Sequence, residues 1–240
     1  MIPKKLTKLI ILIAITITAS IMSAQTQNTI KLPAPRLDSE FSIEGTLLER
    51  RSVREYSKDA LTLEQLSQLL WACQGINLPD KRTHTEKLHE YGLRTAPSAG
   101  ALYPLEVFVI VKNVTGLPPG SYHYHSGPGI EDNNLELLRD GNLTQELAGA
   151  ALGQDCIKNA AVNIIIGAVV ERVGVKYGSR AEQYTWIETG HAGQNICLQA
   201  QALGLGVTTV GAFYEDKIKK VIGTEINPVY LITVGKKLPK

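Results

Sequence analysis

Three arginines and one serine stand within five residues, in Arg50-Arg51-Ser52-Val53-Arg54. Guanidinium groups form bidentate hydrogen bonds with phosphate, and a serine hydroxyl adds a further donor. A solvated helical face is the alternative reading. Against it, the only acids at the cluster are Glu49 and Glu55, which flank it. The spacing therefore favours the binding of a phosphorylated molecule.

A second stretch, Pro97-Ser98-Ala99-Gly100, is suited to contact with a flat ligand. Pro97 fixes its own φ angle, Gly100 admits conformations that a Cβ forbids, and the small side chains leave the backbone accessible. An apolar run over 106–111 follows and is typical of a buried strand. A loop held by a core strand is a common place for a binding site, although an ordinary loop before a strand has the same composition.

His123 and His125 alternate along a short segment that resembles an edge strand, so the two imidazoles could bind a metal ion together. No nearby acid or third histidine is evident to complete such a site, and we expect surface histidines and no metal. The three cysteines, Cys73, Cys156 and Cys197, lack metal-ligand spacing. Cys73 and Cys197 stand among apolar residues at helical spacing, so we expect these two to be small core residues.

Hydrophobic spacing and capping residues predict the elements that position these groups. Thr62 and Gln65 form a capping box, and Gly75 ends the helix that it opens. The spacing further predicts a buried strand over 160–170, a polar loop over 171–180, a long helix over 181–203, and strand, helix and strand over 206–213, 216–222 and 229–234. Gln194, Asn195 and Gln199 on the long helix indicate a subunit interface, because polar groups on a buried helix need partners. No G-x-G-x-x-G or P-loop motif follows a strand, so the sequence does not support a Rossmann dinucleotide site or a P-loop phosphate site.

Near the start of the 240-residue chain, Lys4, Lys5 and Lys8 precede an apolar run that ends at Ala24, the pattern of a secretory signal. We expect 1–24 to be a signal peptide or N-terminal anchor, 25–44 a flexible tether, and 45–240 a single domain. Removing 1–24 leaves 22 basic and 23 acidic residues, a net charge of −1, which excludes a general basic surface for nucleic acid. We expect an exported protein, periplasmic or extracellular, with membrane anchoring through the N-terminal segment as the alternative to cleavage.

Several motifs, in order along the chain, resemble those of the nitroreductase-like flavoproteins, most closely the SagB/ThcOx dehydrogenase branch. They cover roughly 46–236 and comprise Arg50-Arg51-Ser52-x-Arg54, Leu70-Trp71-Ala72-x-Gln74-Gly75, Pro97-Ser98-Ala99-Gly100-Ala101-Leu102-Tyr103-Pro104-Leu105-Glu106, Glu188-x-Gly190-His191-x-x-Gln194-Asn195, Ala202-Leu203-Gly204-Leu205-Gly206 and Val210-Gly211-Ala212-Phe213. The resemblance implies an α+β domain, a nitroreductase-like mixed β-sheet flanked by helices, in an intertwined homodimer. Two FMN molecules would lie at the subunit interface.

The resemblance also implies which residues contact FMN. Arg50, Ser52 and Arg54 would hold the phosphate and ribityl chain, with Arg51 nearby. The isoalloxazine would meet Pro97, Ser98, Ala99 and Gly100, from the other subunit. Flavin N5 would lie near the backbone amides of Val210 and Gly211, and the phosphate near Lys236 and Lys237.

One departure separates this chain from typical nitroreductases, which often have Asn at the position of Ala101 and Gln at that of Tyr103. It favours the SagB/ThcOx branch, in which an adjacent Lys-Tyr pair serves azoline oxidation. Lys176 and Tyr177 match that pair and are the candidate catalytic residues, although an exposed loop pair is the alternative.

The implied activity is an FMN-dependent transfer of hydride between flavin and a small organic or peptidic, azoline-type substrate. One alternative is an NAD(P)H-dependent nitro or quinone reductase; export argues against it because nicotinamide nucleotides are largely cytosolic. The other alternative is a non-catalytic flavin-binding protein on the same fold.

Overall fold

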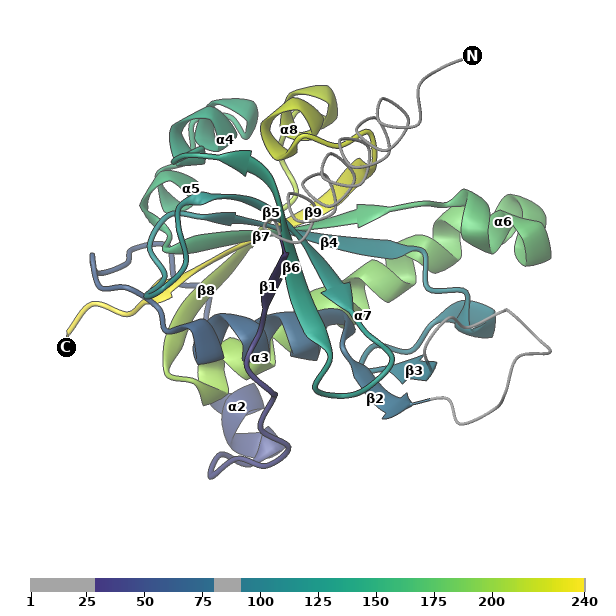
Figure 1. The fold of residues 1–240 in the computed structure, drawn as a ribbon, viewed down its shortest axis with the longest axis horizontal. Helices are drawn as coiled ribbons and strands as arrows, with labels where there is room; N and C mark the ends of the chain where they lie inside the picture. Colours follow the sequence, from purple (N-terminus) through teal and green to yellow (C-terminus); the bar gives the residue numbers. More distant parts are fainter. Residues whose placement is uncertain (1–28, 80–91, 240) are drawn as a thin grey trace, which may run out of the picture. The chain divides into compact units, whose positions relative to one another are not determined.

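A computed structural model describes residues 29–79 and 92–239 (Figure 1). The expected signal segment, 1–24, and the first residues of the expected tether, 25–28, lie outside the described residues. Among the residues that are described, no helix has the length and apolar character needed to cross a membrane. The chain divides into two units, Met1–Ile30 and Lys31–Lys240, and the second contains nearly all of the described structure.

The second unit is built on a sheet whose strands follow the order β6-β5-β4-β7-β9-β8. Each of these neighbouring strands is antiparallel to the next. Two isolated bridges outside the named strands, Ser52–Val207 and Leu61–Val114, are parallel. The strands are β4 (Leu105–Val111), β5 (Gly120–Ser126), β6 (Asn133–Asp140), β7 (Val162–Ala168), β8 (Leu205–Val210) and β9 (Asn227–Lys236).

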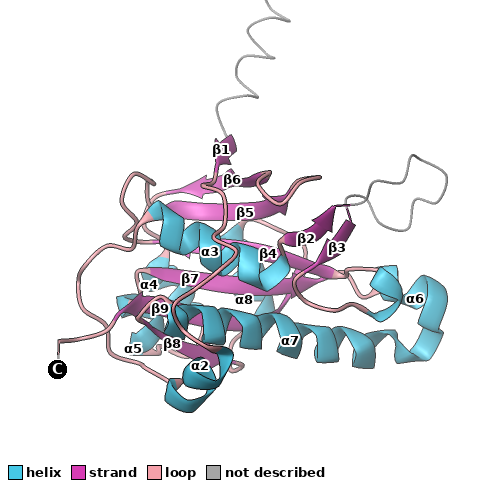
Figure 2. Ribbon diagram, turned by 90° about the horizontal axis from the view of Figure 1, so that it is seen from below, coloured by secondary structure: helices cyan, strands magenta, loops and turns pink. Residues whose placement is uncertain are grey.

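Helices cover both faces of this sheet, so the unit has three layers (Figures 1 and 2). One face carries α2 (Ile43–Glu49), α3 (Leu63–Gln74) and α7 (Ala181–Ala202), and the other carries α4 (Thr144–Ala150), α5 (Asp155–Asn159) and α8 (Glu215–Ile222). The central strands β4 and β7 are buried almost throughout because both of their faces are covered. The expected α+β fold with flanking helices is confirmed.

The α3 helix begins as the sequence predicts. The Thr62 hydroxyl accepts a hydrogen bond from the Gln65 N–H, and the Gln65 side chain accepts one from the Thr62 N–H. Such caps stabilise a helix by about 1 kcal/mol. Gly75 ends α3, and a Cβ there would lie 2.2 Å from Cδ1 of Trp71, so only glycine fits without a shift. The short hairpin β2 (Ile76–Pro79) and β3 (Gly92–Arg94) follows.

The structure corrects the polar loop expected over 171–180. This segment forms α6 (Glu171–Tyr177) and the 3₁₀ turn η3 (Gly178–Arg180), directly before α7. Val173 is the single fully buried residue of α6 and anchors it, and the other residues of the helix are exposed or half-buried. One apolar anchor in seven residues gives no helical periodicity, which explains why the pattern resembled a loop.

Compact structure also begins earlier than the expected boundary at Gly45. Leu32, directly after β1 (Thr29–Lys31), is 2% exposed, and its N–H donates to the carbonyl of Asn133. The Ser67 hydroxyl of α3 donates to the Pro33 carbonyl, and the N–H of Arg36 donates to the Gln68 side chain. Residues 32–36 are therefore fixed to β6 and α3, although their composition resembles a tether.

Candidate functional site

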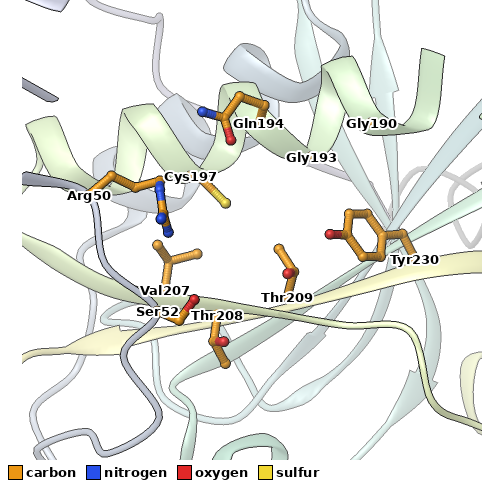
Figure 3. Close-up of a pocket in the computed structure, with 10 residues that line it drawn as sticks. All are labelled: Arg50, Ser52, Gly190, Gly193, Gln194, Cys197, Val207, Thr208, Thr209 and Tyr230. Carbon is orange, nitrogen blue, oxygen red and sulfur yellow. The ribbon is translucent and has the colours of Figure 1, made fainter. Parts of the chain in front are cut away.

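A cavity lies between α7 and the edge of the sheet formed by β8 and β9 (Figure 3). It encloses about 440 Å³, including the part open to solvent, and is lined by Arg50, Ser52, Gly190, Gly193, Gln194, Cys197, Val207, Thr208, Thr209 and Tyr230. Arg50 and Ser52 reach it because the chain after α2 runs beside β8. The N–H of Val53 donates to the Val207 carbonyl at 2.9 Å, which fixes this register.

The cluster of arginines divides between the cavity and the solvent. The Arg50 side chain extends into the cavity beside Ser52 (Figure 3). The Arg51 guanidinium instead donates to the carbonyls of Leu48 and Arg50, each at 2.8 Å, and is exposed. Arg54 is exposed and does not line the cavity. Of the four residues assigned to the phosphate, the structure brings two together at the cavity.

The α7 wall of the cavity is made of small residues. A Cβ on Gly193 would lie 2.8 Å from Cε1 of Tyr230, so glycine lets the helix approach the aromatic ring of β9. Cys197 is 6% exposed, and burial raises the pKa of its thiol while the nearby charge of Arg50 partly offsets this. Sequence reasoning placed Cys197 in the core without seeing that it faces a cavity.

The other wall comes from the sheet, where the Thr209 side chain points into the cavity and that of Thr208 points to the opposite face of β8 (Figure 3). Sequence reasoning did not single out these threonines or Tyr230. They sit in strand patterns that predict burial but not which face meets a cavity. The resemblance did include Gly190 and Gln194 in its motif, and this motif is the signal that could have found the α7 wall.

The loop of Pro97, Ser98, Ala99 and Gly100 leads into the 3₁₀ turn η2 (Ala99–Ala101). The Ser98 hydroxyl accepts a hydrogen bond from the Tyr103 N–H at 2.9 Å. Gly100 has a φ of 61°, and a Cβ there would lie 2.9 Å from the Tyr177 hydroxyl and 3.2 Å from Nζ of Lys176. The structure thus places Lys176 and Tyr177 directly against this loop.

A buried carboxyl, Glu188 of α7, lies close to the same loop. Its side chain is 2% exposed, and no described residue completes a hydrogen bond of normal geometry with its oxygens. Burial raises the pKa of Glu188 to about 7, and the neighbouring Ser98, Arg94 and Gln74 offset this only in part. The carboxyl can therefore gain or lose a proton near neutral pH.

The remaining residues expected at the cofactor lie beside the cavity. Val210 is buried at the end of β8, opposite Leu231, and Gly211 follows it in an exposed position. The cavity is lined instead by the three residues that precede Val210, 207–209.

The two lysines expected near the phosphate also lie outside the cavity lining. Lys236 pairs with Leu205 at the end of β9, and Lys237 donates from Nζ to Gln201 at 3.0 Å. Gln201 in turn donates to Glu49, which precedes Arg50 in the chain.

The structure corrects the expectation that no acidic residue lies near His123 and His125. Carboxylates do lie near both, because Nε2 of His123 is 2.9 Å from Glu106 on β4 and Nε2 of His125 is 2.9 Å from Glu136 on β6. Burial disfavours the charged form of Glu106, but the hydrogen bond with His123 and the charge of Arg172 outweigh it and lower the pKa of the Glu106 carboxyl to about 2. Strand pairing brings these groups together, and spacing along one strand could not reveal it.

The domain is an antiparallel sheet between two helical layers, with an arginine- and hydroxyl-lined cavity under its long helix. Residues 47–236 match the family described as Nitroreductase, and the chain belongs to this family. It is 38% identical over 211 residues to the candidate nitroreductase MJ1384 of Methanocaldococcus jannaschii, covering 88% of this chain and 98% of the relative.

Solved structures share the fold. A candidate nitroreductase from Anabaena variabilis superimposes with a TM-score of 0.70 at 29% identity, over 88% of this chain and 42% of that one. The McbBCD microcin synthetase complex of Escherichia coli, solved with a truncated precursor peptide, gives 0.61 at 22% identity over 90% and 81%. The NADPH:FMN oxidoreductase of Vibrio harveyi gives 0.56 at 16% over 82% and 69%. At these last two identities the likeness is one of fold alone.

Replacing Glu188 by Gln should remove a pH dependence of stability. The carboxyl titrates near pH 7 when folded and near 4.5 when unfolded, so between these values the folded state holds more protons. Wild-type stability should therefore fall as pH rises through this window, by on the order of 3 kcal/mol, and then level off. Urea unfolding at several pH values should show this fall in wild type and not in Glu188→Gln.

Glu182→Gln is the matched control, because Glu182 is exposed on the same helix and its replacement removes the same charge. Parallel pH profiles for wild type and Glu188→Gln would show that the buried carboxyl does not titrate in this range.

Proposed function

We propose that this nitroreductase-family oxidoreductase is an FMN-dependent dehydrogenase of the SagB/ThcOx type that oxidises a small organic or peptidic, azoline-type substrate. The observation that carries the proposal is the placement of Lys176 and Tyr177 against Gly100. Lys176 is 76 residues from Gly100 in the sequence, yet α6 brings the side chains of both Lys176 and Tyr177 into contact with the loop. A chance pair in a solvated loop would have no reason to lie there.

The cavity residues suit FMN. The Arg50 guanidinium and the hydroxyls of Ser52 and Thr209 are donors for a phosphate and a ribityl chain (Figure 3). The absence of side chains at Gly190 and Gly193 leaves the α7 wall flat. Family membership supports the same cofactor, as does the name of the Vibrio harveyi fold neighbour.

Bound FMN would supply a two-electron acceptor for hydride. The residues of the chain would then position the substrate and take the proton that leaves with it. Lys176 and Tyr177 are the groups proposed to remove this proton from the substrate carbon. Arg172 supports their position, because its guanidinium donates to the Tyr103 carbonyl at 3.1 Å and thereby ties α6 to the loop.

We also propose a homodimer. Trp186 and Ile187 of α7 and Leu48 of α2 are large apolar side chains exposed by 47%, 49% and 74%. Large exposed apolar side chains on the two helices favour a surface that another chain covers. Light scattering of the flavin-loaded protein should give twice the chain mass. A monomer with FMN fully bound would exclude the dimer.

Arg50→Ala should weaken FMN binding about 10- to 100-fold, the effect of losing a charged hydrogen bond of about 1.5–3 kcal/mol. Arg51→Ala is the matched control, since its guanidinium is held by backbone carbonyls outside the cavity. Quenching of FMN fluorescence by flavin-free protein measures both affinities. Equal affinities for wild type and Arg50→Ala would remove the phosphate assignment.

Lys176→Ala combined with Tyr177→Phe should leave flavin content unchanged and slow flavin reduction by an azoline peptide about 10²- to 10⁴-fold. The assay is anaerobic bleaching of bound FMN. Tyr184→Phe is the control, because its ring packs edge-on against Tyr177 with centroids 5.0 Å apart.

Bleaching of the double variant at the wild-type rate would contradict a role for the pair. Rapid bleaching by NADPH and none by the peptide would favour the alternative, a nicotinamide-dependent nitro or quinone reductase, which the name of the Methanocaldococcus relative supports. A flavin that no donor bleaches would favour a non-catalytic flavin-binding protein.

A further inference from the structure

Four ionisable side chains meet on one face of the sheet, outside the cavity lining. His123 and His125 are two residues apart on β5, so their side chains share a face. The neighbouring strand β6 places Glu136 opposite His123, and β4 places Phe108 there on the other side. The His123 ring stacks on Phe108 with centroids 4.6 Å apart, which limits its freedom.

The ligand atoms of three of these residues are close enough to share one ion. One imidazole nitrogen from each of His123 and His125 and one carboxylate oxygen of Glu136 all lie within 4.8 Å of one another. Around a tetrahedral ion with bonds of about 2.0–2.1 Å, ligand atoms stand roughly 3.3 Å apart. Small side-chain rotations would close this gap, and the backbone of paired strands need not move.

A second carboxylate supports the cluster from β4. Glu106 is 2.9 Å from Nε2 of His123 through one oxygen and pairs with the Arg172 guanidinium through the other. An imidazole has two nitrogens, so His123 can bind an ion through one and keep a carboxylate partner on the other. Carboxylates in that position orient the imidazole and raise its basicity.

The cluster is also accessible from solvent. His123 and Glu106 expose 17% and 18% of their side chains, whereas His125 and Glu136 expose 44% and 47%. One side of the cluster is therefore packed on the sheet and the other is open. An ion could enter from the open side and keep a water molecule there.

We propose that His123, His125 and Glu136 form a binding site for a divalent transition-metal ion of the Zn²⁺ class, with Glu106 orienting His123. Two imidazoles and one carboxylate are a ligand set that zinc uses, with the fourth position left to water. Nitrogen ligands select against Mg²⁺ and Ca²⁺, which prefer oxygen alone. The bound ion would join β5 to β6 and, through Glu106 and Arg172, connect to α6. The site does not depend on the proposed dehydrogenase activity.

The test is a zinc titration of the untagged, full-length protein with its flavin, after treatment with a chelator and dialysis. A chromophoric chelator competes for Zn²⁺ and reports affinity and stoichiometry. Wild type should bind one tight equivalent. His125→Ala and Glu136→Gln should each lower the affinity at least tenfold, and Glu106→Gln should lower it about 10- to 100-fold by loss of the orienting carboxylate.

His191→Ala is the matched control, because His191 is exposed on α7 and belongs to no cluster of metal-ligand residues among the parts of the chain described. It should keep the wild-type affinity. Thermal melting gives a second readout that shows whether each variant folds: Zn²⁺ should raise the Tm of wild type and of His191→Ala, and not that of Glu136→Gln.

Three outcomes would overturn the site. Wild type could bind no stoichiometric zinc, or folded His125→Ala and Glu136→Gln could keep its affinity. Several weak equivalents, lost equally on replacing His191, would show scattered surface histidines instead. Should His125→Ala fail to fold, the nearly isosteric Glu136→Gln decides between these results.

Discussion

The close approach of α7 to the sheet is the constraint on which the site depends. At Gly193 the helix backbone lies so near Tyr230 of β9 that a Cβ would be 2.8 Å from the ring. This approach sets the width of the cavity, because Gly190 and Cys197 lie on the same wall and Val207 and Thr209 face them across it (Figure 3). Helix α7 also contacts α2, α3 and α6. The position of this one helix therefore fixes where Arg50, directly after α2, enters the cavity and where α6 ends.

A second consequence of that position is the meeting of two segments far apart in sequence. The helix α6 precedes α7 and therefore reaches the loop before β4. Lys176 and Tyr177 contact the loop at Gly100. Arg172 bonds both the Tyr103 carbonyl of the loop and the Glu106 carboxylate of β4. The proposed proton acceptors and the loop proposed to contact the flavin thus belong to one packed arrangement, with the buried carboxyl of Glu188 beneath it.

Sequence predicted the fold where local signals were strong. The Thr62–Gln65 capping box, the apolar runs of β4 and β7 and the long helix were all confirmed, because caps and periodicity act within a few residues. The cluster at 50–54 indicated an anion site, but which arginine faces the cavity depends on the pairing of Ser52 with Val207. Helix α6, with Val173 as its single fully buried anchor, and the carboxylates beside His123 and His125 depend on tertiary contacts that no local pattern encodes.

The loop at 98–103 contains two residues other than glycine with left-handed backbones, Ala101 at φ 52° and Tyr103 at φ 45°. Each costs about 1–2 kcal/mol in an isolated chain, so the loop sequence does not favour its own shape. That shape is imposed by the Ser98 hydroxyl, which binds the Tyr103 N–H, and by Arg172, which binds the Tyr103 carbonyl. The loop is therefore not a transplantable module. Grafted onto another scaffold without α6, it would relax.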